Sequence, residues 1–65
     1  MVIGFKTRSG SEYSIDLLGK TISGGNLREP MNYEKGFIIP GLRAVFTDRN
    51  ENTLRTSEVS ELIKT

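Results

Sequence analysis

Two stretches of alternating apolar and polar residues flank Gly10 near the N-terminus, and they constrain the fold more than any other feature. Alternation with a period of two is typical of a β-strand that buries one face. Residues 2–7 and 11–17 are therefore predicted to form a β-hairpin. Its turn is predicted to be Arg8-Ser9-Gly10, with Gly10 in the left-handed conformation of a three-residue loop.

The polarity of facing residues restricts the register of this hairpin. A two-residue turn at Ser9-Gly10 would mix the apolar and polar faces, because a shift of one residue turns every side chain over. The loop Arg8-Ser9-Gly10 gives the pairs Thr7–Ser11, Phe5–Tyr13 and Ile3–Ile15 on one face, and Lys6–Glu12 and Val2–Asp16 on the other. A loop of Ser9-Gly10-Ser11, which pairs Phe5 with Ile15, also keeps the faces separate, so the register stays open.

Further short strands are predicted at residues 21–23, 37–39, 42–47 and 53–56, between glycine, proline and polar turns. Residues 24–36 follow no period and are predicted to be a long loop, which in a compact domain is usually functional or disordered. Residues 57–65 have two alternatives. One is a closing strand, favoured because the rest of the chain is β; the other is a short helix capped by Ser57.

These elements predict a single mostly β domain over residues 1–65. The expected architecture is a small SH3-like or OB-like barrel of five to six short strands, with a short C-terminal helical turn as the alternative to the last strand. The apolar faces of the strands place Phe5, Phe37 and Phe46 in the core and Tyr13 at its edge.

A chain of 65 residues buries a small core, and such domains are usually reinforced by disulfides, a metal or oligomerisation. The chain contains no Cys and no His, which excludes disulfides and a Cys/His zinc site. A homo-oligomer is therefore weighed equally with a monomer. The lack of Cys fits a reducing cytoplasm, which is the expected location.

Composition also restricts the class of function. Without Cys or His, the Ser–His and Cys–His pairs of nucleophilic catalysis are absent, and most carboxylates fall at turns or on solvent-facing positions. We therefore expect no enzyme, cofactor or metal site. The net charge of +1 disfavours a general nucleic-acid binder but allows a local basic patch. No apolar run has the ~20 residues of a membrane helix, and residues 1–5 enter a strand pattern rather than a signal peptide.

Two glycine-containing turns are candidate anion sites. Arg8 lies in the hairpin turn, and Gly24-Gly25-Asn26 is followed by Arg28. Backbone N–H groups and a guanidinium at such turns can bind a phosphate. Ordinary turn chemistry also explains both segments without a ligand.

Four residues outside these turns are further candidates for ligand binding. Tyr33 and Lys35 lie in the unpatterned segment. Tyr33 is expected either to stack on a base or anchor a partner, or to cover the small core. Arg43 and Arg55 are predicted to lie on neighbouring strands and to point away from the core. With Lys6 they form a basic face, unless opposite charges make it a mixed solvated surface.

Two strings of the sequence resemble a known group of proteins. Thr7-Arg8-Ser9-Gly10-Ser11-x-Tyr13-x-Ile15-Asp16 and Thr56-Ser57-x-Val59 are similar to segments that open and close small uncharacterised β-barrel proteins of bacteriophages and their hosts. The resemblance implies a phage accessory protein, such as an inhibitor of a host factor or a protein that sequesters a nucleotide signal. It transfers no binding residue.

Three hypotheses about function follow. The first is a non-enzymatic binding module that takes an anionic ligand such as a nucleotide. The second is an inhibitor or adaptor that binds a host protein through a sheet edge or through residues 24–36. The third is a nucleic-acid-binding barrel.

Overall fold

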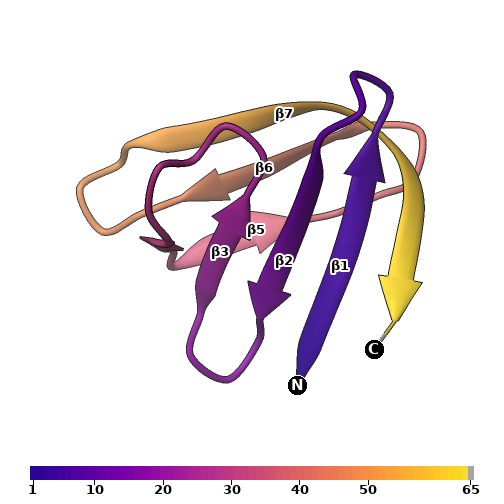
Figure 1. Cartoon of the computed structure of the whole chain (residues 1–65). Coiled ribbons are helices and arrows are strands. Elements are labelled where there is room, and N and C mark those ends of the chain that lie inside the picture. Colours follow the sequence, from indigo (N-terminus) through magenta and orange to yellow (C-terminus); the bar gives the residue numbers. More distant parts are fainter. Residues whose placement is uncertain (65) are drawn as a thin grey trace.

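The computed structural model describes residues 1–64, and all regular structure in this range is β-strand (Figure 1). One curled antiparallel sheet has the strand order β4-β3-β2-β1-β7-β6-β5. The strands are β1 (Val2–Thr7), β2 (Glu12–Asp16), β3 (Thr21–Gly24), β4 (Met31–Asn32), β5 (Lys35–Phe37), β6 (Arg43–Thr47) and β7 (Thr53–Lys64). The predicted mostly β, barrel-like fold is confirmed, with seven strands where five to six were expected.

The first hairpin has the register predicted for the loop Arg8-Ser9-Gly10. Phe5 pairs with Tyr13 and Ile3 with Ile15, and Gly10 has a φ of 91°, in the left-handed region. The rings of Phe5 and Tyr13 are stacked with their centroids 5.1 Å apart. The alternative loop, which pairs Phe5 with Ile15, is therefore wrong.

The long strand β7 belongs to two ladders. Its first half pairs with β6 and its second half pairs with β1 (Figure 1). Two irregularities in register divide these halves. In the first, Ala44 of β6 faces both Thr56 and Ser57 of β7. In the second, Ser60 is an extra residue of β7 opposite the step from Lys6 to Thr7 in β1. Such β-bulges bend a strand and increase its twist, which lets β7 pass from one side of the curled sheet to the other.

At both bulges, side-chain hydroxyls form hydrogen bonds with backbone groups. The Ala44 N–H donates to Thr56 Oγ1 at 3.1 Å, and that hydroxyl donates to the Ser57 carbonyl at 2.7 Å. At the second bulge, Ser60 Oγ donates to the Lys6 carbonyl at 3.3 Å. Thr56 is only 3 % exposed, so its hydroxyl satisfies an amide that would otherwise be buried without a partner.

The two ends of the strand order lie close together because β4 and β5 are consecutive in the chain. The intervening residues bridge the ends: the Tyr33 N–H donates to the Lys20 carbonyl at 3.0 Å, and the Glu34 N–H donates to the Thr47 carbonyl at 2.8 Å. The sheet thus curls around one core. The buried apolar residues of that core are Phe5, Tyr13, Ile15, Ile22, Ala44, Phe46 and Val59.

Three sequence-based expectations are corrected. Residues 24–36 are not one irregular loop, because β4 and the first two residues of β5 lie inside this range. The strand predicted at residues 37–39 is shifted towards the N-terminus, and Phe37 is 50 % exposed instead of lying in the core. The helical alternative for residues 57–65 is wrong through residue 64, which ends β7; residue 65 lies outside the described residues.

Gly36 explains why β5 begins two residues earlier than the strand predicted at residues 37–39. It pairs with Phe46, and a Cβ at Gly36 would lie 2.3 Å from Phe46 Cδ1. The ring of Phe46 is 2 % exposed and stacks in the core with Phe5, so it has no room to move aside. The inward position of β5 therefore falls on a glycine, and its neighbours on either side point outward.

We expect Gly36→Ala to destabilise the fold by about 1–3 kcal/mol, because it overpacks the core against Phe46. The matched control is Gly4→Ala in β1, where the nearest atom to the new Cβ is the Tyr13 carbonyl oxygen at 3.4 Å, an ordinary contact. Urea unfolding of both variants provides the measurement. Equal unfolding midpoints for the two variants would contradict the packing described for Gly36.

Candidate functional site

The register of β5, β6 and β7 gathers cations on the outer face of this part of the sheet. Residues that pair across strands share a face, and Ala44 and Phe46 occupy the inner one. The outer positions form three rows: Lys35–Thr47–Thr53, Phe37–Val45–Arg55, and Arg43–Glu58. We call the surface made by Lys35, Arg43, Val45, Thr47, Thr53 and Arg55 the cationic face.

Within the described part of the chain, the three cations of this face have no acidic partner. Among residues 1–64, no carboxylate oxygen lies within 4.0 Å of the charged group of Lys35, Arg43 or Arg55. Glu58 is opposite Arg43 in the register, but its ion pair is with Arg8, at 3.4 Å. The predicted placement of Arg43 and Arg55 on neighbouring strands, pointing outward, is confirmed.

Lys6 does not belong to the cationic face. It lies on β1 and forms an ion pair with Glu12 of β2 at 3.4 Å. The basic surface predicted from Lys6, Arg43 and Arg55 is thus divided, and Lys35 takes the third place. Sequence reasoning singled out Lys35 but could not place it beside Arg43 and Arg55, because β5 was expected two residues later.

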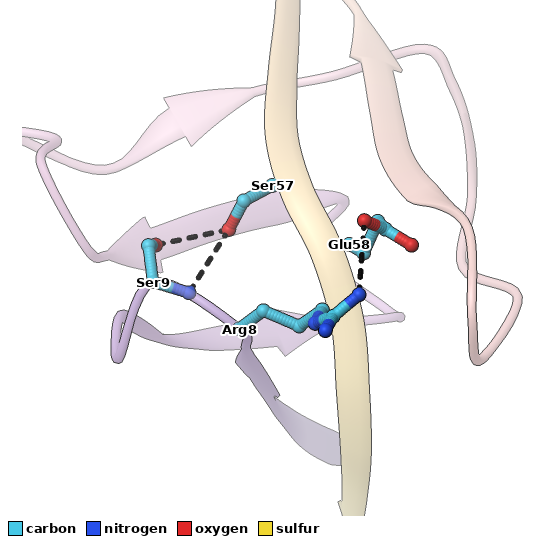
Figure 2. Close-up of polar contacts among 4 residues, drawn as sticks. All are labelled: Arg8, Ser9, Ser57 and Glu58. Atoms are coloured by element: carbon cyan, nitrogen blue, oxygen red, sulfur yellow. Dashed lines mark hydrogen bonds and ion pairs between the residues drawn. The ribbon is translucent and has the colours of Figure 1, made fainter.

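The tip of the first hairpin is docked on β7. Figure 2 shows the Ser9 hydroxyl and the Ser57 hydroxyl in contact, at 2.9 Å, and the Arg8 guanidinium beside the Glu58 carboxylate. The Ser9 N–H also donates to Ser57 Oγ at 3.4 Å, and the Arg8 N–H donates to the Glu58 carbonyl at 2.9 Å. The N–H groups of Arg8 and Ser9 and the charge of Arg8 therefore hold the hairpin tip to β7.

Close packing against β2 explains why positions 24 and 25 are glycines. Gly25 has a φ of 54°, and a Cβ there would lie 2.3 Å from the ring of Tyr13. Its N–H donates to the Glu12 carbonyl at 2.8 Å, so this amide already has an acceptor. Asn26 and Arg28 follow in the exposed segment between β3 and β4. The structure does not bring these residues to the cationic face.

Tyr33 lies between the core and a polar groove. Its ring meets Phe46 edge-on, with the centroids 5.2 Å apart, so Tyr33 covers one end of the core. It also lines an open groove of about 670 Å³ formed by the β2–β3 turn, residues 31–34 and the β6–β7 turn.

The charges of the polar groove are balanced. Lys20 and Arg49 line it together with Glu34 and Asp48, and Arg49 forms an ion pair with Glu34 at 3.5 Å. Asp48 accepts hydrogen bonds from the backbone amides of the turn that follows it. An anion gains little from a groove of zero net charge, so the cationic face is the stronger candidate for an anionic ligand.

Comparisons with known proteins add no relative: no family model, curated protein or solved structure matches the chain. The resemblance to small phage-type β-barrel proteins therefore stays a hypothesis. No helix of the described residues is long and apolar enough to cross a membrane.

The turn after β6 predicts a pH dependence of stability. Hydrogen bonds to Asp48 lower the pKa of its carboxyl below 3.8; the largest cause is the backbone amide of Asn52, followed by the Asn52 side chain and the amide of Asn50. A carboxyl whose pKa is lower in the folded state contributes stability above pH 3.8, and that contribution is lost as the pH falls through the folded pKa.

We expect Asp48→Asn to be less stable than the natural protein near neutral pH, and the difference to shrink as the pH falls below 3.8. Urea unfolding in buffers on both sides of that pH measures the difference. A difference that stays constant with pH would show that the charge of Asp48 contributes nothing to the turn.

Proposed function

We propose that this protein is a non-enzymatic binding module that holds a single strand of nucleic acid on its cationic face. The observation that carries the proposal is the register of β5, β6 and β7, which aligns Lys35, Arg43 and Arg55 on one surface. None of the three has a carboxylate partner among residues 1–64. Unpaired cations aligned along a sheet provide the attraction to phosphates that accounts for most of the affinity of nucleic-acid binding.

The spacing of the three cations favours an extended ligand over a mononucleotide. On a regular sheet the Cα atoms of Arg43 and Arg55 are about 8 Å apart, whereas Lys35 lies about 12 Å from Arg55 and about 14 Å from Arg43. The two long arginine side chains can reach one phosphate together. Lys35 is then placed to reach another phosphate further along the strand.

The side chains of this face suit phosphate groups. A guanidinium can donate two parallel hydrogen bonds to a phosphate, and threonine hydroxyls are common donors to phosphate oxygens. Thr47 and Thr53 lie in the row that begins with Lys35. Phe37, half exposed at the border of the face, offers a ring on which a base can stack. A net charge of +1 is compatible with this site, because the attraction is local.

The experiment is fluorescence anisotropy with a labelled oligothymidine over a series of salt concentrations. Neutralising these two phosphates predicts a slope of about −1.4 for log K against log salt, which is roughly a sevenfold loss of affinity between 50 and 200 mM salt. The triple variant Lys35→Gln, Arg43→Gln and Arg55→Gln should lose about tenfold or more of the low-salt affinity and most of the slope.

The matched control removes three positive charges elsewhere, with Lys6→Gln, Lys20→Gln and Arg49→Gln. It should keep most of the affinity and the slope. Equal losses in the two triple variants would mean that net charge, not the cationic face, binds the strand. Thymidine monophosphate and a polyglutamate peptide are the competing ligands, and equal affinity for either would contradict binding of an extended phosphate backbone.

A further inference from the structure

A second, apolar groove of about 280 Å³ opens between the two sides of the curled sheet. Ile3 and Ile15 line it from β1 and β2, Leu62 from β7, and Phe37 and Ile38 from the opposite side. The groove reaches inward to Phe46 beside Gly36, the position at which a side chain would meet the Phe46 ring. It is separate from the cationic face except at Phe37, which borders both.

The rim of this groove exposes side chains that belong to the inner face of the sheet. Leu62 pairs with Phe5, which is fully buried, yet Leu62 itself is 42 % exposed. Leu17 directly follows β2, on the side of Ile15, and is 41 % exposed. The core-facing side of the sheet therefore continues past the end of the core and is left without a cover by residues 1–64.

The total exposed area of the protein is also larger than expected for a chain of this mass. A monomeric protein of 7.3 kDa is expected to expose roughly 4,200 Å². This protein exposes 4689 Å², an excess of roughly 500 Å². The chain has neither Cys nor His with which to reinforce a small core, and association is another way to stabilise it.

We propose that this groove is the interface of a symmetric dimer, and that its occupant is a second copy of the chain. The groove offers a hollow beside Gly36 and protruding apolar side chains on the rim, so a twofold axis would place the rim of each copy against the hollow of the other. Every described residue that lines it is uncharged, so two copies meet without charge repulsion.

The size of the excess area indicates a small interface. Covering roughly 500 Å² on each copy is below the ~800 Å² per partner of a standard interface and falls in the class of weak, transient contacts. We therefore expect dissociation in the micromolar range or weaker. The apparent mass should depend on concentration instead of remaining at twice the 7.3 kDa of one chain.

Sedimentation equilibrium of the intact protein from about 10 μM to about 1 mM tests the proposal. The mass should rise towards that of two chains. Leu17→Ser and Leu62→Ser should each weaken dimerisation about tenfold or more, whereas the control Leu18→Ser should leave it unchanged. Leu18 is 86 % exposed and does not line the groove, and far-UV circular dichroism establishes that each variant is folded.

A natural protein that remains monomeric up to about 1 mM would overturn the proposal and leave the groove to a different protein. If Leu18→Ser weakened the dimer as much as Leu62→Ser does, the proposal would also be overturned. Association would then depend on the overall hydrophobicity of the surface and not on the groove. The variant without Lys35, Arg43 and Arg55 charges should still dimerise, so failure of the dimer and failure of nucleic-acid binding are distinguishable.

Discussion

The hydrogen bond from the Ala44 N–H to the Thr56 hydroxyl is the contact on which the rest of the architecture depends. It lies at the point where β7 has one residue more than β6, and it satisfies a buried amide for which the regular ladder offers no carbonyl. With Ser60 at the second bulge, it lets one strand of twelve residues pair with β6 and then with β1. Without this bend the strand would continue flat, and the sheet would not curl around Phe5 and Phe46.

The same bend accounts for both proposed surfaces. The first half of β7 lies beside β6 and adds Arg55 to the row of Phe37 and Val45, which completes the cationic face. The second half turns down beside β1 (Figure 1). Its inward residue Leu62 lies past the end of the core and is left partly exposed. A small core that a single chain leaves open at one end is the expected result for 65 residues.

Sequence periodicity was sufficient for the parts of the fold in which turn chemistry and polarity agree. The first hairpin was predictable in register because Gly10 and the facing pairs favour the same loop. The outward direction of Arg43 followed from the alternation of β6. The same reasoning failed for β5, because its single inward position is Gly36, which carries no polarity signal and is defined only by the ring of Phe46. The apolar run that follows, residues 37–39, therefore predicts a strand two residues too late.

The bulges could not be predicted for a related reason. An extra residue in a strand only shifts the phase of the alternation between apolar and polar residues. Threonine is common in regular strands, so Thr56 does not mark the position of the bulge. The missing register information also affected the prediction of the candidate site. Arg8 is predicted to bind an anion, although the docking of the hairpin tip on β7 gives it Glu58 as a partner. Lys35 is a candidate from the sequence, but only the position of β5 places it on the same face as Arg43 and Arg55.

Amide hydrogen exchange at Ala44 tests the central role of Thr56 most directly. We expect slow exchange of this amide in the natural protein and retention of that protection in Thr56→Ser. Exchange should be about tenfold faster or more in Thr56→Val, which keeps the shape of the side chain but lacks the hydroxyl acceptor. Exchange at the rate of an exposed amide in the natural protein, or unchanged protection in Thr56→Val, would contradict that role.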